Sequence, residues 1–316
     1  MKKLLPLVVI VGPTAVGKTA VGIKVAGRIN GEIISGDSMQ VYKYMDIGTG
    51  KPTIEEMAGI PHHMIDIIGP DEEYNVAKFQ KQVEDYIVII KQKRKIPVLV
   101  GGTGLYIRSV LDCYDFTPPG GDAAKREELL RLSAEHGNEY LVKMLRDVDP
   151  AAAEKIHPND TRRLVRAIEV YHSLGRPISD FQYISGQLPP KYNLVYYGLT
   201  MNRQDLYGKI EQRVDSMLAG GLVDEVRKLV EMGYNPRSTA LQALGYKEII
   251  EYLNGSYDLT EAVELIKRNT RRFAKRQMTW FGRDERIKWR NVENDDSLEE
   301  IAKEIALEAE GQFSGT

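Results

Sequence analysis

The chain has 316 residues, of which 42% are hydrophobic and 28% charged, and it contains a single cysteine. This composition is typical of a soluble protein of a reducing compartment such as the cytoplasm, and it excludes a disulfide scaffold and, for want of a long apolar run, a membrane-spanning chain. The formal net charge of −2 alone argues against a nucleic-acid partner, but basic residues gather between positions 267 and 290 and acidic residues follow from position 293 to position 310.

The first hundred residues alternate between short apolar runs and longer amphipathic runs. Strands are predicted at Leu4–Val11, Glu32–Ser35, His63–Ile67 and Pro97–Val100, and helices at Lys18–Arg28 and Val76–Lys91. The first apolar run enters a glycine-containing loop directly, where a signal peptide would have its cleavage site, so we interpret it as a buried first strand. Apolar strands that alternate with helices are typical of a parallel sheet covered by helices on both faces, which predicts the α/β class.

The middle of the chain has a different pattern. Between residues 116 and 190 the sequence is polar and helical, and it is bounded by the stretches TPPGGD and GQLPP, which are rich in proline and glycine. Strand character returns at Asn193–Met201, and mostly helical sequence follows. We therefore predict a core domain of residues 1–115 and 191–316, with an all-helical domain of residues 116–190 inserted into it.

The loop after the first strand is a specific motif. Its residues are Gly12, Pro13, Thr14, Ala15, Val16, Gly17, Lys18 and Thr19. Two glycines allow a tight turn whose backbone N–H groups face phosphate oxygens, while the lysine reaches the terminal phosphate and the threonine hydroxyl completes a magnesium shell. Because this motif follows a strand and begins a helix, it predicts a P-loop NTPase-like fold that binds a diphosphate or triphosphate together with Mg²⁺.

Two further side chains follow strand ends at the same edge of the predicted sheet. Asp37 comes directly after the second strand, and Thr103 follows the run at Pro97–Val100. Loops at the carboxyl ends of parallel strands line the ligand crevice, so both side chains are predicted beside Lys18. There an acid can take a proton from a nucleophile and a hydroxyl can bond a leaving oxygen. The alternative is that Asp37 caps a helix and Thr103 sits in a turn.

Seven stretches of the sequence together resemble the tRNA dimethylallyltransferases. They are GPTAVGKT, DSMQVYKYMDIGTGKP, GIPHHMID, VGGTGLY, HPNDTRRLVRAIEV, RVDSMLAGGLVDEV and QALGYKE, in the order found in that family. The resemblance covers nearly the whole chain, and it implies transfer of the dimethylallyl group from dimethylallyl diphosphate to the N6 amine of adenosine 37, beside the tRNA anticodon. A single cysteine cannot form the zinc finger of the eukaryotic members, which favours the bacterial form.

The resemblance implies a role for each residue of the predicted donor site. The phosphate loop would hold the donor's diphosphate with Mg²⁺, and Lys18 would neutralise the leaving group. Asp37 is implied as the general base for the adenine amine, and Thr103 as a contact of the reacting centre. Arg213 is implied as a further diphosphate ligand. It lies at the edge of an apolar helical seam, where the alternative is a salt bridge within the protein.

The resemblance also implies a surface that binds the anticodon stem-loop of tRNA. The implied contacts are Asp37, Ser38, Met39, Gln40, Thr103, Arg126, Arg162, Arg163, Leu164, Val165, Arg166, Gln242, Ala243, Leu244, Gly245, Tyr246, Lys247, Arg271 and Arg272. The spacing of the basic residues at 267, 268, 271, 272 and 275 places them on one side of a helix, opposite an apolar seam, as a nucleic-acid backbone requires. The alternative is a solvated helix face.

Two hypotheses from other classes stay open. A P-loop kinase or ATPase would bind a nucleotide in the same loop, but such enzymes usually place an aspartate at the end of an apolar strand, where IPVLVGGTG has glycines. An RNA-binding module with an inactive phosphate loop is the other hypothesis, and the intact Gly17-Lys18-Thr19 argues against it. We expect a monomer, since neither a heptad repeat nor a long apolar patch indicates otherwise.

Overall fold

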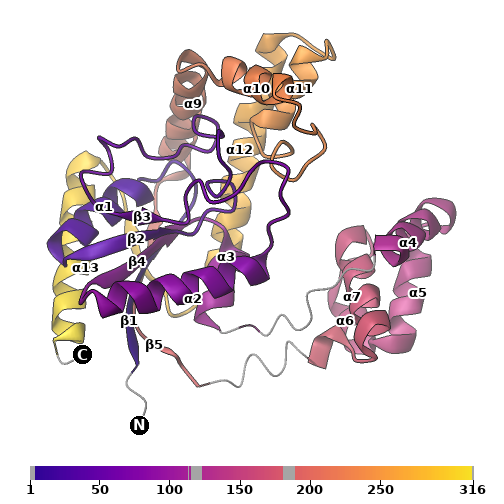
Figure 1. Cartoon of the computed structure of the whole chain (residues 1–316), viewed down its shortest axis with the longest axis horizontal. Helices are drawn as coiled ribbons and strands as arrows, with labels where there is room; N and C mark the ends of the chain where they lie inside the picture. The colour runs from indigo at the N-terminus through magenta and orange to yellow at the C-terminus, as the bar shows by residue number, and fades with distance from the viewer. Residues whose placement is uncertain (1–3, 113, 115–122, 181–188, 315–316) are drawn as a thin grey trace. The chain divides into compact units, whose positions relative to one another are not determined.

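The computed structural model describes residues 4–112, 114, 123–180 and 189–314. The chain divides into two compact units (Figure 1): a core unit of Met1–Leu111 and Lys191–Thr316, and an inserted unit of Asp112–Pro190. The domain boundary predicted at residues 115 and 116 lies outside the described residues. None of the helices in the described part of the chain is long and apolar enough to cross a membrane.

The core unit is built on one six-stranded parallel sheet, which confirms the predicted α/β class. Its strands are β1 (Leu5–Val11), β2 (Gly31–Ser35), β3 (His62–His63), β4 (Ile96–Gly101), β5 (Tyr192–Thr200) and β6 (Lys288–Asn291), in the spatial order β3-β2-β4-β1-β5-β6. β1 is buried from Pro6 to Val11 because it has strands on both sides and helices on both faces. A strand in that position needs apolar residues on both faces, which explains its continuous apolar sequence.

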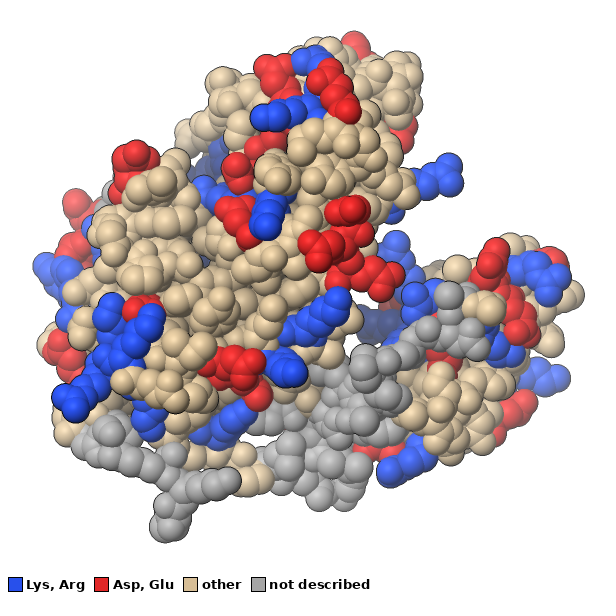
Figure 2. All heavy atoms as spheres, in the orientation of Figure 1, with Lys and Arg blue, Asp and Glu red and all other residues tan. Residues whose placement is uncertain are grey.

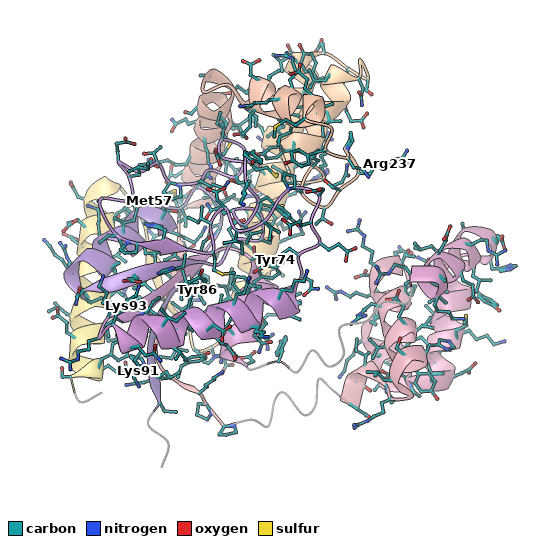
Figure 3. The ribbon with its side chains drawn as sticks, in the orientation of Figure 1. Met57, Tyr74, Tyr86, Lys91, Lys93 and Arg237 are labelled. Carbon is teal, nitrogen blue, oxygen red and sulfur yellow. The ribbon has the colours of Figure 1, made fainter. Side chains whose placement is uncertain are left out.

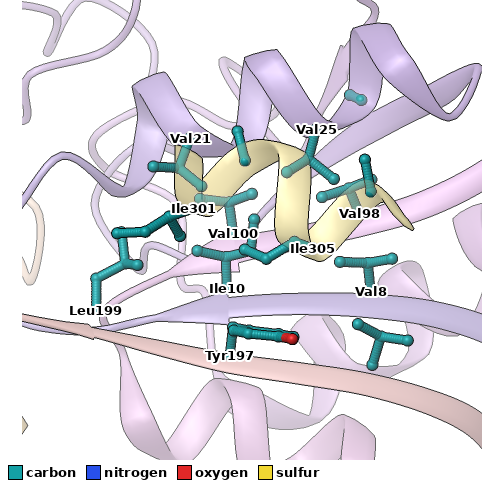
Figure 4. Close-up of a cluster of buried hydrophobic side chains, with 14 of the residues drawn as sticks. Val8, Ile10, Val21, Val25, Val98, Val100, Tyr197, Leu199, Ile301 and Ile305 are labelled. Atoms are coloured by element: carbon teal, nitrogen blue, oxygen red, sulfur yellow. The ribbon is translucent and has the colours of Figure 1, made fainter. Parts of the chain in front are cut away.

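Helices α1 (Lys18–Arg28) and α13 (Asp295–Phe313) cover one face of the sheet (Figure 1). Figure 4 shows Val21 and Val25 of α1 and Ile301 and Ile305 of α13 packed against Ile10 of β1. These side chains are almost completely buried. Burial of an aliphatic side chain stabilises a fold by about 1.5–3 kcal/mol. These contacts therefore hold α1 against the sheet, and with it the loop that precedes α1.

The opposite face is covered by α2 (Val76–Gln92), α3 (Gly104–Leu111) and the C-terminal end of α12 (Leu259–Phe281). Phe79 of α2, Ile107 of α3 and Phe281 of α12 are buried there against β1 and β4. The N-terminal half of α12 packs instead with α9 (Arg203–Ala219), α10 (Leu222–Glu231) and α11 (Tyr246–Leu253) around a second core. The segment after β2 joins that core through Val41 and Met45.

The inserted unit has a hydrophobic core of its own. It contains α4 (Ala123–His136), α5 (Asn138–Val148), α6 (Pro150–Lys155) and α7 (Thr161–Leu174). Leu129, Leu141, Leu145 and Leu164 are completely buried among these helices. A unit that buries its own leucines does not depend on the sheet for its fold.

The strand predicted at His63–Ile67 is wrong beyond its first residue, since β3 comprises only His62–His63. The backbone leaves the extended conformation directly afterwards, because Met64 and Asp66 have φ values of 66° and 55°. β3 is also linked to β2 by a side-chain hydrogen bond, because His63 Nε2 lies 2.8 Å from the carboxylate of Glu32 on β2.

Glu32 is a buried carboxylate at the sheet edge. Burial disfavours its charge, but hydrogen bonds from His63, Lys95 and Lys93 outweigh this effect and hold its pKa at about 2. Lys93, which follows α2, and Tyr86, whose ring centroid lies 4.5 Å from that of His63, are labelled in Figure 3. This cluster attaches α2 to the edge of the sheet.

Candidate active site

Three loops meet at the carboxyl edge of the sheet, because β2, β4 and β1 are neighbours in it. The loop after β1 is the predicted phosphate loop, the loop after β4 carries Thr103, and the loop after β2 carries Asp37. The N–H of Gly36 donates to the carbonyl of Val100 at 2.7 Å, and the N–H of Thr103 donates to the carbonyl of Gly36 at 3.3 Å. The loops of Asp37 and Thr103 therefore form one continuous edge.

The phosphate loop has the geometry that its sequence predicts. Gly17 has a φ of 96°, in the left-handed region that favours glycine, and α1 begins at the next residue. Lys18 is turned back onto the loop, where its Nζ donates to the carbonyl of Pro13 at 2.6 Å. Thr19 lies exposed in the first turn of α1. The N-terminus of α1 and the lysine thus face the space that the loop encloses.

The ammonium group of Lys18 has an unusually low pKa. The residue as a whole is half-buried, but its charged end is enclosed, and this burial together with the positive charge of Arg213 lowers its pKa to about 7. The negative charge of Asp37 acts in the opposite direction. Asp37 therefore lies within electrostatic range of Lys18, at the sheet edge where its position after a neighbouring strand predicts it.

Arg213 of α9 is the second cation of the site. Burial lowers the pKa of its guanidinium, while the charges of Asp37 and Glu56 raise it. Its Nη2 lies so close to Gly50 that a Cβ at that glycine would be 1.9 Å away. No hydrogen bond or ion pair to the guanidinium is found within the described part of the chain. A buried guanidinium without such a partner, close to the enclosed ammonium group of Lys18, is suited to bind a multiply charged anion.

Asp37 and Thr103 both shape their loops. One carboxylate oxygen of Asp37 accepts a hydrogen bond from the N–H of Met39 at 2.8 Å. The hydroxyl of Thr103 accepts one from the N–H of Ser38 at 3.1 Å and donates to the Ser38 hydroxyl at 3.3 Å. The turn-forming alternative is thus part of the structure, and it leaves the second carboxylate oxygen of Asp37 available for chemistry.

Glu225 of α10 holds a loop of the site in place, and no pattern in the sequence predicts this role. Its carboxylate accepts hydrogen bonds from the N–H groups of Asp46, Ile47 and Gly48 at 2.8–3.1 Å, and from the hydroxyl of Tyr246 at 2.6 Å. These bonds hold the loop that ends at Gly50, against which Arg213 packs. All but one of the partners are backbone groups, which leave no pattern in the sequence.

Gln277 of α12 was also missed. Its side-chain oxygen accepts a hydrogen bond from the N–H of Thr14, and its side-chain nitrogen donates to the carbonyl of Gly102.

A separate cavity of about 330 Å³ borders the phosphate loop on the α13 side, and its lining does not include Lys18, Asp37 or Thr103. The residues that line it are Ala15, Val16, Gly17, Met201, Lys209, Val292, Glu293, Asn294 and Leu298.

The basic face of α12 consists of two kinds of residue. Lys267 pairs with Asp215 at 2.7 Å and Arg271 pairs with Glu211 at 2.6 Å, both across to α9. Arg268, Arg272 and Lys275 are exposed, and no ion pair to them is found among the residues that the structure describes. The exposed arginine and lysine side chains remain available for a polyanion. Both signs of charge occur across the face of the molecule that Figure 2 shows.

Several of the predicted RNA contacts have buried side chains. Leu164 and Val165 belong to the core of the inserted unit, and Tyr246 belongs to the second core of the core unit. Ala243 and Gly245 are likewise buried, whereas Gln242 is exposed. Figure 3 labels the exposed Arg237, which lies in the segment before α11. On these segments, RNA would therefore contact the exposed residues that lie next to the buried ones.

In the inserted unit, the predicted arginines differ in the same way. Arg126 donates two hydrogen bonds to the buried carboxylate of Glu169, at 2.7 and 3.2 Å. Arg166 lies 3.8 Å from the same carboxylate. Arg162 and Arg163 are exposed, and Arg163 pairs with Asp160 at the start of α7. Arg126 and Arg166 thus neutralise a buried charge, which Arg162 and Arg163 do not.

Comparison with known families gives a consistent result over nearly the whole chain. The model of the IPP transferase family matches residues 40–284, and that of the isopentenyl transferases matches residues 5–68. A tRNA dimethylallyltransferase from Carboxydothermus hydrogenoformans is 57% identical over 96% of this chain and 97% of its own length. One from Pelotomaculum thermopropionicum is 51% identical over 97% of each chain.

Solved structures give the same result. The tRNA isopentenylpyrophosphate transferase of Bacillus halodurans superposes with a TM-score of 0.72 at 44% identity, and the match covers 98% of both chains. A eukaryotic dimethylallyltransferase acting on tRNA superposes with a TM-score of 0.80 at 28% identity, over 97% of this chain and 79% of that one.

Proposed function

Since the chain belongs to the IPP transferase family, we propose that it transfers the dimethylallyl group of dimethylallyl diphosphate to the N6 amine of adenosine 37 in the anticodon loop of tRNA. That it is a prenyltransferase of tRNA follows from its relatives, which confirms the resemblance found in the sequence. The choice of nucleotide, the anticodon stem-loop as partner, a monomeric state and a cytoplasmic location belong to the proposal.

One observation supports the donor site most directly. The positive charge of Arg213 helps to lower the pKa of the enclosed Lys18 ammonium group, and the carboxylate of Asp37 acts on both cations in the opposite direction. A diphosphate with several negative charges would neutralise both cations and raise the pKa of Lys18. Arg213 offers the paired N–H groups that phosphate oxygens accept.

Mg²⁺ fits this site only as an ion that the donor brings with it. Among the described residues no group of three or more His, Cys, Asp or Glu side chains could enclose a metal. The ion would be held by the diphosphate oxygens and the hydroxyl of Thr19, the arrangement that Mg²⁺ prefers with phosphates. When bound, it would neutralise charge that develops on the leaving diphosphate.

In the proposed step, the bond between the dimethylallyl carbon and the diphosphate oxygen breaks as the bond from that carbon to N6 forms. The lone pair of the adenine amine is delocalised into the ring, so its proton must be taken as the new bond forms. Asp37 would accept that proton, and the Thr103 hydroxyl would contact the reacting centre. The adenine would have to leave the base stack, which costs a few kcal/mol.

Labelled dimethylallyl diphosphate tests the proposal. The chain would be incubated with Mg²⁺ and an unmodified tRNA that carries adenosine at position 37, and in parallel with the same tRNA carrying guanosine there. We expect label only on the first tRNA. Label on both would contradict the assigned position. Hydrolysis of ATP without any prenyl transfer would favour the P-loop kinase or ATPase instead.

A further inference from the structure

Gln277 is a buried amide that bonds two loops of the candidate site at once. Only 5% of the residue is exposed. Its side-chain oxygen lies 2.8 Å from the N–H nitrogen of Thr14, and its side-chain nitrogen lies 2.9 Å from the carbonyl oxygen of Gly102. Thr14 belongs to the phosphate loop, and Gly102 directly precedes Thr103. One side chain therefore sets the spacing between the diphosphate cradle and the loop that carries the Thr103 hydroxyl.

The glycines on both sides of Thr103 allow α12 to approach this closely. A Cβ at Gly102 would lie 2.2 Å from the side-chain nitrogen of Gln277, and a Cβ at Gly104 would lie 2.1 Å from the ring of Trp280. Gln277 and Trp280 are three positions apart on α12, so they lie on the same face of the helix. α12 thus contacts the backbone immediately before and immediately after Thr103.

The hydrogen bonds continue from Thr103 to Asp37. The N–H of Ser38 donates to the Thr103 hydroxyl at 3.1 Å, and the N–H of Met39 donates to the carboxylate of Asp37 at 2.8 Å. Displacement of the Thr103 loop would therefore displace the loop of the proposed base as well. Small displacements matter here, because a reacting group misplaced by about 1 Å can cost about 10²-fold in rate.

We propose that Gln277 is a positioning residue for prenyl transfer, which holds the phosphate loop and the Thr103 loop at the spacing that the reaction requires. The inference rests on the proposed function. An amide suits this position because it accepts one hydrogen bond and donates another from the same planar group. Gln277 acts through backbone groups of the loops, so its loss should slow turnover more than it weakens binding of either substrate.

The Gln277→Met variant tests this role, because methionine is similar in size but forms neither hydrogen bond. We expect kcat to fall by about 10- to 100-fold, with KM for donor and tRNA changed by less than about threefold. Thr270→Val is the matched control. It removes a buried hydroxyl of the same helix, and among the described residues that hydroxyl bonds only to the carbonyl of Ile266, within α12. Its kcat should remain that of the wild type.

The Gln277→Glu variant makes the pH dependence of kcat a second test, because a merely structural role of Gln277 would not change that dependence. A protonated carboxyl group can donate to the Gly102 carbonyl and accept from the Thr14 N–H, as the amide does, whereas a carboxylate cannot donate. Burial raises the pKa of such a carboxyl group. The ratio of the variant's kcat to the wild-type kcat should therefore rise as the pH is lowered from about 8 to about 5.5. The ratio cancels the titration of groups that both proteins share.

Three results would overturn the proposal: turnover of Gln277→Met equal to that of Thr270→Val, a loss that lies entirely in KM, or a kcat ratio of Gln277→Glu that does not change with pH. Thermal unfolding establishes that the variants are folded, and if Gln277→Met is not, the pH series decides. A wild-type chain that transfers no dimethylallyl group to tRNA would overturn the proposed function itself, and the positioning role with it.

Discussion

Lys18 differs from an ordinary lysine because burial of its charged end, together with the positive charge of Arg213, lowers its pKa to about 7. A bound diphosphate reverses this effect, because a nearby negative charge favours the protonated form. The free enzyme therefore loses the Lys18 charge as the pH rises through about 7, whereas the complex retains it to higher pH.

Donor binding should accordingly take up a proton above about pH 7, and the Kd for a diphosphate ligand should rise with pH between about 7 and 9. Lys18→Arg retains its charge throughout this range, so this variant should lack the extra slope. Titration calorimetry of inorganic diphosphate in buffers of different ionisation enthalpy measures both quantities. Because the ligand's own titration is common to both proteins, equal slopes for the two would contradict the assignment.

Asp37→Asn removes the proposed base and leaves its turn intact, since an asparagine oxygen can still accept from the Met39 N–H. We expect kcat to fall by about 10²- to 10⁴-fold, with the affinities for tRNA and donor within a few-fold of wild type. Steady-state kinetics near pH 6.5 measures this while Lys18 remains largely protonated. Turnover close to that of the wild type would remove Asp37 from the mechanism.

The sequence was sufficient to place some of these residues at one edge of the sheet and insufficient for others. Lys18, Asp37 and Thr103 follow strand ends, and the geometry of a parallel sheet brings such residues together whatever their distance along the chain. Gln277 lies 263 residues from Thr14 and bonds only backbone groups, so its sequence position resembles that of any helical glutamine. Glu225 escaped prediction for a similar physical reason, since three of its four partners are backbone N–H groups.

At the scale of whole elements, α12 has two chemically different sides. One side is buried and carries Gln277, and the other carries the basic residues. Two neighbouring arginines on the basic side differ in their surroundings, because Arg271 is paired with Glu211 whereas Arg272 is exposed.

Arg272→Ala should therefore weaken tRNA binding and reduce the slope of log K against log salt by about one. Arg271→Ala should have a smaller effect on the slope, since its guanidinium is already neutralised within the protein. Binding of the donor should be unchanged in both variants. Filter binding of tRNA at several salt concentrations measures the slopes, and a slope that Arg272→Ala leaves unaltered would assign this face to solvent.

Strands with two buried faces were predictable, and strands at the sheet edges were not. Continuous apolar runs located β1, β2, β4 and β5 to within about two residues. β6 was missed because its residues are mostly polar or charged, and Lys288 and Arg290 in it pair with Glu308 and Glu304 of α13. Such an edge strand is stabilised by ion pairs with a neighbouring helix, and neither the spacing of its apolar residues nor its hydrophobicity indicates these pairs.

On the scale of the whole molecule, the two units have separate hydrophobic cores, so damage to one should leave the other intact. Leu164→Ala removes a completely buried side chain from the inserted unit and should cost about 2–5 kcal/mol there. Hydrogen exchange should then accelerate in α4–α7, with protection of β1 and β4 retained. Leu99→Ala, in β4, is the matched variant and should show the opposite pattern. Loss of protection in both units from either change would mean that the units unfold together.

The close approach of α12 to the Thr103 loop also restricts how the chain can evolve. A Cβ added at Gly102 or Gly104 would lie about 2 Å from Gln277 or Trp280. We therefore expect a substitution of either glycine to follow a substitution on the helix that shortens the facing side chain. We therefore expect chains with glutamine and tryptophan at these helix positions to favour glycine at both loop positions. Saturation mutagenesis of Gly102 and Gly104 in a wild-type and a Gln277→Ala background would show this as epistasis, with larger residues accepted at position 102 only in the second background.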